Sequence, residues 1–451
     1  MNICIIGGGM MGLATAYFLA EPNINVTVFE KEKEVGGLSR PAEMLPGLLW
    51  DRFYHVILST DVELLDFLDE IGLSIDIQFK ATKTGFFTDG QLHSMSNIME
   101  FLCFKPLSIL DKLRLGTGIF FASRIRMGSR LENIYAKTWL IHVFGRRNYE
   151  KLWDPLIRSK LGSASSKASG SFIWAIIKRY YGTRHKGSKQ EFLGCVHGGY
   201  HSILRNIKEK LQDKQVKILL EHSAVSLAPL SDGKIIVSDN DGNKMLFDKV
   251  VATIPNPNIT PLLPQQSKTL KDQLSKIDYL NLVCVDLVTN ASLCPFYITN
   301  ITDPGFPFTG IIDATNIVPK EILDNHGLIY LPRWMPSDDP FINLSDSEII
   351  DRFYKGLRRI FPKFSEESVT NVSVNREYNV QPIQTVGYNK NVIPMETCIE
   401  GFYVVNTTMI LNSTLNNNQV IRLAKKMAKK IKGNFYSRDR NWSMKSLLHN
   451  S

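Results

Sequence analysis

Residues 2–40 read NICIIGGGMMGLATAYFLAEPNINVTVFEKEKEVGGLSR. The apolar start predicts a short β-strand, and Gly7, Gly9 and Gly12 follow it in the spacing G-x-G-x-x-G. In this pattern the first glycine permits a tight turn, the second lets the backbone approach a pyrophosphate, and the third lets a helix pack closely on the strand. The residues after Gly9 predict that helix, whose N-terminus presents free N–H groups to phosphate. The stretch therefore predicts a dinucleotide-binding unit.

The second half of the stretch adds an acid and another pair of glycines. Residues 24–29 predict the second strand, and Glu30 ends it 18 residues after Gly12, where a carboxylate can bind ribose hydroxyls. Gly36 and Gly37 follow within a few residues and supply a second loop whose backbone can approach the same pyrophosphate. An NAD site does not require this second pair.

The spacing E-x(5)-G-G-x-x-R, from Glu30 to Arg40, resembles the extended fingerprint of a large FAD family. That family includes amine oxidases, protoporphyrinogen oxidases, phytoene desaturases and UDP-galactopyranose mutase. The resemblance covers most of the chain and is closest to the bacterial protoporphyrinogen-oxidase-like and phytoene-desaturase-like branch. It implies FAD, rather than NAD, as the cofactor. Further stretches that match in equivalent order are 51–57, 153–162, 197–204, 221–228, 247–255 and 404–424.

The order of predicted elements and the resemblance together imply an α/β fold. We expect a Rossmann-like FAD-binding domain of the GR2 type with an inserted α+β substrate domain. Among the predicted helices is 59–72, which a capping box of Thr60 and Glu63 is expected to start. The expected ranges are 1–58, 192–256 and 382–435 for the FAD domain, 59–191 and 257–381 for the substrate domain, and 436–451 for a basic C-terminal tail.

The resemblance also implies which residues contact the cofactor. His55, in the loop DRFYHVI, is expected to contact the flavin or the substrate, or to shuttle a proton; the alternative is a buried histidine that fixes the loop. Val225 matches the position whose backbone pairs with adenine, and Asn406 and Thr407 stand where many relatives carry Gly-Asp. The full set of expected cofactor-binding residues is Gly7, Gly9, Met11, Gly12, Glu30, Lys31, Gly36, Gly37, Leu38, Ser39, Arg40, His55, Val225, Asn406, Thr407, Asn417, Asn418 and Gln419.

Residues that are missing from two segments narrow the chemistry. Segment 406–419 has no cysteine, so we expect FAD to be bound non-covalently, and segment 283–288 has no lysine, which argues against fast amine oxidation by oxygen. The six cysteines are scattered, with no CxxC, and we expect no metal site. Arg333 and His55 are the candidate catalytic residues. The candidates for substrate contacts are Arg158, Arg333, Arg376 and Gln381. The three arginines could bind a phosphate or carboxylate, or could form ion pairs between domains.

The positive charge of the chain is concentrated in two segments. Lys and Arg exceed Asp and Glu by 53 to 44 overall, but by 18 to 4 within 105–189 and by 8 to 1 within 425–449. This distribution suits an anionic small-molecule or lipid-linked substrate, or an anionic membrane surface, whereas no nucleic-acid-binding motif accompanies it. Residues 98–130 mix apolar side chains with six cations. This segment either lies on an anionic membrane or packs its apolar face inside the substrate domain.

No run of about 18 uncharged apolar residues is present, and the apolar start of the chain is assigned to the cofactor unit. We therefore expect a cytoplasmic protein, with peripheral attachment to the inner face of the membrane as the further option. The oligomeric state is left open.

Three functions fit the sequence. The first is an FAD-dependent oxidoreductase that abstracts a hydride from an amphiphilic or anionic substrate. The second is a nucleotide-sugar isomerase resembling UDP-galactopyranose mutase, although this chain has GGLSR where mutases typically have a histidine after the glycine pair. The third is a flavin-binding protein in polysaccharide or lipid-linked sugar biosynthesis.

Overall fold

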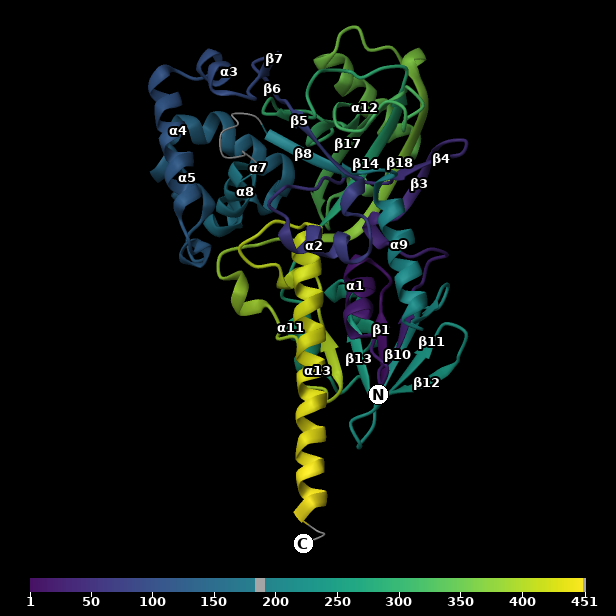
Figure 1. The fold of residues 1–451 in the computed structure, drawn as a ribbon. Helices are drawn as coiled ribbons and strands as arrows, with labels where there is room; N and C mark the ends of the chain where they lie inside the picture. The colour runs from purple at the N-terminus through teal and green to yellow at the C-terminus, as the bar shows by residue number, and fades with distance from the viewer. Residues whose placement is uncertain (183–190, 449–451) are drawn as a thin grey trace.

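The computed structural model of the chain describes residues 1–182 and 191–448. Figure 1 shows a parallel sheet and its helices at the lower right, a helical bundle at the upper left and a mixed sheet at the upper right. The architecture is α/β with an inserted α+β domain, as the sequence predicts.

The parallel sheet has the strand order β19–β13–β1–β2–β9, with β1 in the middle. Side chains on β1 alternate between two cores, because successive residues of a strand point to opposite faces. Ile3 and Ile5 pack toward the helices, whereas Cys4 and Ile6 pack toward a small antiparallel sheet. The strands are β1 (Asn2–Ile6), β2 (Asn25–Phe29), β9 (Lys217–Leu219), β13 (Lys249–Ala252) and β19 (Phe402–Val404).

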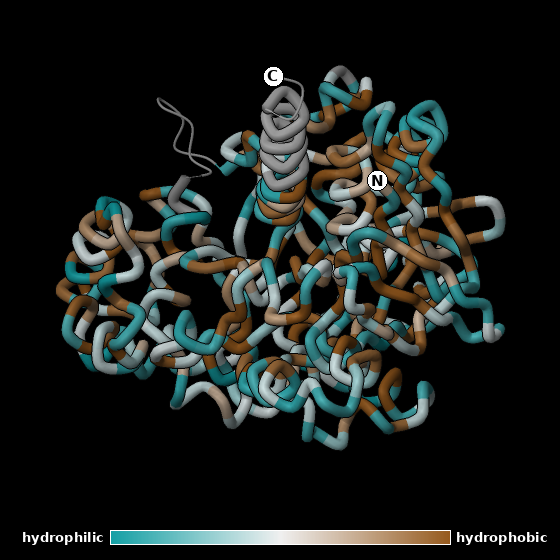
Figure 2. The backbone as a smooth tube through the Cα atoms, turned by 90° about the horizontal axis from the view of Figure 1, so that it is seen from below, coloured by the Kyte–Doolittle hydropathy of each residue, from teal (hydrophilic) through white to brown (hydrophobic). Residues whose placement is uncertain are grey.

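The small antiparallel sheet is formed by β10 (Ala224–Pro229), β11 (Ile235–Asp239) and β12 (Lys244–Phe247). It covers one face of the parallel sheet together with α11 (Lys268–Leu274). Figure 2 shows hydrophobic segments (brown) concentrated around the N-terminus, where these strands run.

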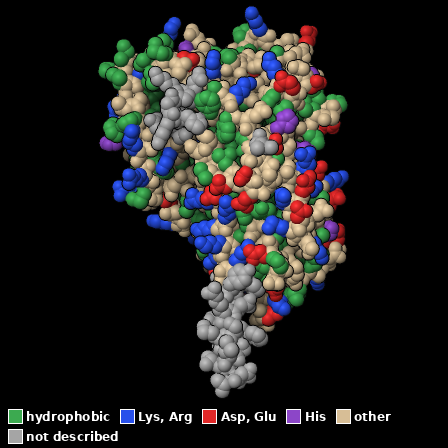
Figure 3. All heavy atoms as spheres, in the orientation of Figure 1, with side chains coloured by type: hydrophobic (Ala, Val, Ile, Leu, Met, Phe, Trp, Pro, Cys, Tyr) green, Lys and Arg blue, Asp and Glu red, His purple; other side chains and the backbone are tan. Residues whose placement is uncertain are grey.

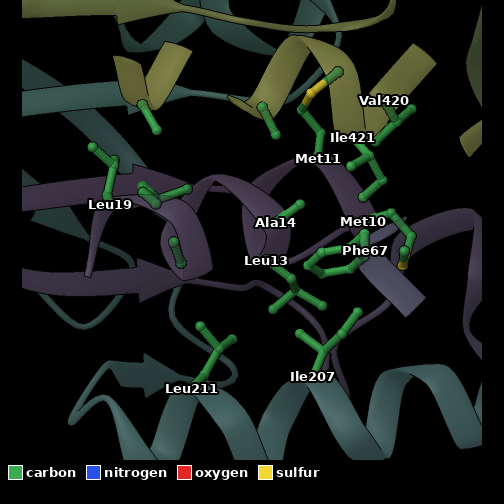
Figure 4. Packing of buried hydrophobic residues seen from close by; sticks show 14 of the residues in the cluster. Met10, Met11, Leu13, Ala14, Leu19, Phe67, Ile207, Leu211, Val420 and Ile421 are labelled. Carbon is green, nitrogen blue, oxygen red and sulfur yellow. The ribbon is translucent and has the colours of Figure 1, made fainter. Parts of the chain in front are cut away.

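The opposite face of the parallel sheet is covered by helices that pack around α1 (Met10–Leu19). Figure 4 shows side chains of α1 between α13, α2 and α9: Val420 and Ile421 from α13, Phe67 from α2, and Ile207 and Leu211 from α9. This packing fixes α1 with its N-terminus at the end of β1. The three helices are α2 (Val62–Glu70), α9 (Gly199–Asp213) and α13 (Asn417–Leu448).

The substrate domain combines a mixed sheet with a helical bundle (Figure 1). The sheet order is β18–β14–β17–β16–β15–β6–β7, and every residue of β14 is buried. The strands are β6 (Thr84–Thr88), β7 (Gln91–Ser94), β14 (Tyr279–Thr289), β15 (Ile298–Ile301), β16 (Gly310–Asp313), β17 (Gly327–Pro336) and β18 (Val369–Pro382), with α12 (Asp346–Ile360) packed on the sheet. The bundle contains α3 (Ile98–Cys103), α4 (Ile109–Arg124), α5 (Ala136–Phe144), α6 (Arg146–Asn148), α7 (Asp154–Leu161) and α8 (Gly170–Gly182).

Two further strand pairs form sheets of their own: β3 (Pro41–Leu45) with β4 (Leu48–Asp51), and β5 (Ile77–Thr82) with β8 (Glu191–Val196). Within the described ranges, none of the helices is both long and apolar enough to cross a membrane.

Two local predictions need correction. The helix expected at 59–72 begins at Val62, and no capping box forms, because the N-cap is Asp61 and its side chain does not cap the helix. The Asp61 carboxylate instead accepts a hydrogen bond from Leu58 N and pairs with Arg179. The range 436–451, expected to be a tail, continues α13 as far as Leu448; residues 449–451 lie outside the described ranges.

Candidate functional site

Two glycine loops face each other at the end of β1. Gly36 N donates a hydrogen bond to Gly8 O (2.8 Å), and Gly9 and Gly36 form an isolated parallel bridge. Gly36 has φ of +123°, a conformation that residues with a Cβ rarely adopt. The two loops predicted separately from the sequence therefore form one backbone cradle.

Two glycines of the first loop, Gly9 and Gly12, are needed for different reasons. Gly9 has an ordinary extended backbone (φ −73°, ψ 175°), and a Cβ on it would lie 3.9 Å from Gly37 Cα, so the protein itself tolerates a side chain there. A Cβ on Gly12 would lie 1.8 Å from Gly7 O, which the close packing of α1 forbids. The absence of a side chain at Gly9 thus keeps the space in front of the cradle open.

The Glu30 carboxylate holds the first loop in place. It is buried, and its oxygens accept hydrogen bonds from Gly8 N (2.7 Å) and Glu32 N (3.0 Å). An ionised carboxylate has about four acceptor positions, so these two bonds leave capacity for ribose hydroxyls. Glu32 in turn accepts a hydrogen bond from Arg40 (2.8 Å), which lowers the pKa of Glu32.

A cavity of about 720 Å³ extends from this cradle into the substrate domain. Of the expected cofactor and catalytic residues, Gly7, Gly9, Met11, Glu30, Lys31, Gly36, Gly37, Leu38, Ser39, Arg40, His55, Asn406, Thr407 and Asn417 line it. Its far part is lined by apolar and aromatic side chains that sequence reasoning missed, including Trp153, Leu156, Ile157, Phe172 and Trp334. A concave, mostly apolar site with a few polar groups is typical of ligand binding.

Several expected site residues do not line this cavity. Asn418 accepts a hydrogen bond from Leu64 N (3.0 Å) in α2, and Gln419 lies further along α13. Val225 is 46% exposed and falls at a register shift between β10 and β11, while its neighbour Ala224 lines the cavity. Gly12 acts through packing beneath the loop, as described above.

The three arginines singled out in the sequence already have partners. Arg333 pairs with Asp339 (3.1 Å) and does not line the cavity. Arg158 is exposed and pairs with Asp154 (2.7 Å), and Arg376 pairs with Asp346 and binds carbonyls before α12. None of the three arginines lines the cavity.

His55 lies at the cavity wall in a buried polar cluster. Its ring packs on Tyr200, with 4.4 Å between ring centroids, and Nδ1 lies 2.8 Å from Phe53 O. A carbonyl can only accept, so Nδ1 carries the hydrogen and Nε2 of the neutral ring is left as an acceptor. Burial lowers the pKa of His55 to about 4, so the ring is neutral at physiological pH.

Asp51 lies beside His55, with 3.8 Å between Oδ2 and Nδ1. Its Oδ1 accepts a hydrogen bond from Tyr200 N (2.7 Å), and the carboxyl group is buried. Burial raises the pKa of Asp51 to about 7. At pH 7 the His55 ring is therefore neutral and the Asp51 carboxyl group is about half ionised.

Asn406 belongs to the Asn-Thr pair that stands where many relatives carry Gly-Asp. Its amide nitrogen donates to Ile254 O and Asn256 Oδ1 (both 2.9 Å), and its oxygen accepts from Thr408 N (3.0 Å) and from the Thr408 hydroxyl (2.6 Å). All of these bonds are internal, so Asn406 holds the turn before α13. The N-terminus of α13 follows at the cavity wall, where Asn416 and Asn417 lie.

One group of possible metal ligands lies beside the cradle. Side-chain atoms of His222, Asp239 and Asp241 lie within 4.8 Å of one another. Asp239 already accepts hydrogen bonds from the backbone of Asp241 and from Asn243, which hold the turn between β11 and β12. Among the described residues of this group, Asp239 therefore has a structural role in the hairpin.

The sequence profile of the family described as "Flavin containing amine oxidoreductase" matches residues 10–383. A curated relative, zeta-carotene desaturase from Synechocystis sp., is 22% identical over 428 residues, which cover 83% of this chain and 85% of the relative. Two solved structures share the fold. A candidate protoporphyrinogen oxidase from Exiguobacterium sp. 255-15 has a TM-score of 0.75, 19% identity and coverage of 96% and 99%. Reduced UDP-galactopyranose mutase has a TM-score of 0.73, 17% identity and coverage of 96% and 95%.

The different roles of Gly9 and Gly12 predict different failures. We expect Gly9→Val to fold with the thermal midpoint of flavin-free wild type but to purify with little flavin, because its side chain fills the space in front of the cradle. Gly12→Ala should lower the thermal midpoint, because its Cβ meets Gly7 O. Glu30→Ala should also lose flavin, since the buried N–H of Gly8 in the first loop loses its acceptor, at a cost of about 1–3 kcal/mol. Full flavin content in Gly9→Val would contradict this assignment.

The raised pKa of Asp51 predicts how stability depends on pH. The protonated form is favoured in the folded state, so the contribution of Asp51 is present below its ordinary pKa of 3.8 and is lost as pH rises toward about 7. The unfolding free energy of Asp51→Asn relative to wild type should therefore increase by about 2–3 kcal/mol when the pH rises from about 5 to about 8. Denaturant unfolding at both pH values measures this gain. Asp69→Asn, an exposed acid in α2, is the control, and an equal gain there would overturn the prediction.

Proposed function

The chain belongs to the flavin-containing amine oxidoreductase family and is a flavin-dependent oxidoreductase, and from this premise we propose that it uses non-covalent FAD to remove a hydride from an amphiphilic, anionic substrate. The observation that carries the proposal is the continuity of one cavity from the glycine cradle to an apolar chamber in the substrate domain.

The cradle fits the phosphate and ribose part of FAD. Gly7, Gly9, Gly36 and Gly37 would hold the pyrophosphate through their backbone, and Glu30 would bind the ribose. The N-terminus of α13 and the loop that contains His55 would border the flavin ring. The redox chemistry would come from the bound cofactor, which takes up the hydride that the substrate loses.

The far chamber fits the apolar part of an amphiphilic substrate. Side chains from α7, α8 and β17 line it, among them Ile157, Phe172 and Trp334. Apolar walls exclude water from the reacting carbon and favour hydrocarbon by burial. His55 Nε2 is a neutral acceptor at the edge of this chamber and could hold a proton or a polar group of the substrate.

Two experiments test the cofactor and the reaction. Acid precipitation of purified protein should release FAD into the supernatant, since none of the described residues that line the cavity is a cysteine. Flavin that remained with the pellet would contradict non-covalent binding. Anaerobic addition of a substrate should then bleach the flavin absorbance in proportion to the substrate oxidised.

The same measurement decides the second candidate function, a flavin-dependent sugar isomerase. The structural likeness to UDP-galactopyranose mutase supports it, and the Leu38-Ser39 sequence after the glycine pair weighs against it. An isomerase converts its substrate without net loss of electrons. Substrate turnover by pre-reduced protein, with no bleaching of the oxidised form, would favour the isomerase.

We also propose that the protein takes its substrate from an anionic lipid surface. The α3–α4 surface is defined by the exposed apolar residues Ile98, Met99, Leu102, Ile109, Leu110, Leu113, Phe120, Phe121 and Met127. Figure 3 shows hydrophobic side chains (green) gathered over this part of the bundle at the upper left, with Lys and Arg (blue) below them.

Helix α4 has its apolar side turned outward. Ile109 and Leu110 are 75% and 78% exposed, whereas the inner side carries Gly118 and Ala122. A Cβ on Gly118 would lie 2.6 Å from the Phe144 ring, so close packing uses the small residues. Contiguous exposed apolar area on a surface is typical of an interaction site.

Basic side chains beside these apolar residues favour an anionic lipid surface as the partner. Lys105, Arg114, Arg124, Arg126 and Arg130 are exposed around α3 and α4. Each cation near an anionic surface contributes roughly 1 kcal/mol, so several together support reversible attachment. Lys112, by contrast, is buried and bonds to Leu102 O, so it contributes to the fold.

Vesicle co-sedimentation tests this attachment. Binding should require phosphatidylglycerol in phosphatidylcholine vesicles and should weaken with salt, because the headgroup attraction is screened. The triple variant Ile109→Ser, Leu110→Ser, Phe121→Ser should lose most of the binding, whereas Leu246→Ser, an exposed leucine in β12, should not. Wild-type protein that bound neither kind of vesicle at low salt would rule the proposal out.

A further inference from the structure

Lys160 brings a cation into the wall of the substrate chamber. It lies near the end of α7, and with Ile157 and Leu161 it lines the cavity from one side of that helix. Its Nζ lies 4.8 Å from the centre of the Trp334 ring. A cation over an indole face is attracted to it, so this contact holds the ammonium in the chamber.

Trp334 connects this cation to the loop expected to border the flavin. The Trp334 indole Nε1 donates to the Tyr54 hydroxyl (3.3 Å), and Tyr54 precedes His55 at the cavity wall. The backbone N of Trp334 donates to the Thr309 hydroxyl (3.2 Å), which itself donates to Ser159 O (3.2 Å) in α7. One ring therefore separates the Lys160 ammonium from that loop.

Lys160 differs from the other described cations that line the cavity. Within residues 1–182 and 191–448, no carboxylate or hydrogen-bond acceptor contacts its ammonium. The other lining Lys and Arg side chains have acid partners: Lys31 and Arg40 with Glu32 (3.6 and 2.8 Å), Arg52 with Glu377 (2.6 Å), and Arg179 with Asp61 (2.8 Å).

Burial lowers the pKa of Lys160 to about 8. No nearby charge contributes to this shift. An ammonium that is partly desolvated and lacks a counter-ion gains from any anion that enters the chamber. The charged or titratable groups on the elements packed against α7 are Tyr149, Glu150 and Lys151 in η4 (Tyr149–Trp153), Lys167 in η5 (Gly162–Lys167), and Tyr330 and Arg333 in β17, with Asp154 and Arg158 on α7 itself.

We propose that Lys160 is the anion-binding residue of the substrate chamber, where it pairs with the carboxylate or phosphate of an amphiphilic substrate whose apolar part lies against Trp334. This inference rests on the proposed function and adds the residue that selects for the anionic group. Lys160 thereby acts as a specificity-determining residue of the chamber.

Binding of simple amphiphiles tests the assignment without knowledge of the natural substrate. The probes are octanoate, octyl phosphate and octan-1-ol, titrated calorimetrically into flavin-loaded protein. Wild type should bind one or both anions more tightly than the alcohol. Lys160→Met should bind the preferred anion about tenfold more weakly, as expected for the loss of a charge-assisted hydrogen bond, and the alcohol equally well. Lys160→Arg should restore anion binding.

Arg158→Met is the matched control, because Arg158 lies on the same helix but is exposed and paired with Asp154. It should bind both anions as wild type does. Thermal midpoints and flavin content of all variants show that the fold is retained. The two anion probes distinguish a carboxylate from a phosphate as the preferred group.

Proton uptake gives a readout that a structural lysine would not change. At about pH 8 the free ammonium is half deprotonated, and a bound anion restores its proton, so binding should take up about half a proton. Titration in two buffers of different ionisation enthalpy measures this uptake, which should vanish in Lys160→Met and persist in Arg158→Met.

Equal anion binding by wild type and a folded Lys160→Met would overturn the inference, as would wild type that prefers neither anion to the alcohol. Failure of the proposed oxidoreductase function looks different. In that case anion binding would still depend on Lys160, while no substrate bleached the flavin.

Discussion

The contact between two glycine loops at the end of β1 is the constraint on which the rest of the structure depends. Gly36 N bonds to Gly8 O, and the loops can meet only because Gly36 adopts a positive φ and Gly12 lets α1 pack against Gly7. Everything that surrounds the cradle is arranged to hold it there. The helices α2, α9 and α13 pack on α1, and Glu30 binds the first loop from below.

This constraint explains why the cofactor end could be predicted well from the sequence. Glycine spacing, a following helix and an acid after the next strand form a local pattern, and local patterns survive folding. The hairpin at β11 and β12 and the cap of α12, where Ser345 and Glu348 bond reciprocally, are local in the same sense. Asn406 lies at the cavity wall, but its polar atoms are occupied by hydrogen bonds within the protein.

The substrate end could not be predicted in the same way, because its parts meet only in three dimensions. The sequence suggested Arg158 as a residue that could bind a phosphate or carboxylate, yet this arginine on α7 is exposed to solvent. On the same helix, Lys160 lies against Trp334, which is 174 residues away in sequence. Helical spacing from Ile157 to Lys160 and Leu161 was a readable signal that these residues share a face. Nothing local indicated that this face borders a cavity. The start of α2 was likewise misjudged: the expected capping box of Thr60 and Glu63 does not form, and the N-cap Asp61 pairs with Arg179 from a distant helix.

The strands of the parallel sheet come from distant parts of the sequence, and this has a consequence for synthesis of the chain. Strand β1 leaves the ribosome before the other strands of this sheet, whereas its neighbour β13 begins at Lys249 and the edge strand β19 at Phe402. At typical elongation rates of about 5–20 residues per second, β1 waits roughly 12–50 s for β13. The bundle from α3 to α8, whose contacts are closer in sequence, can form during that interval. The parallel sheet that supports the cradle is therefore among the last parts of the molecule to be completed.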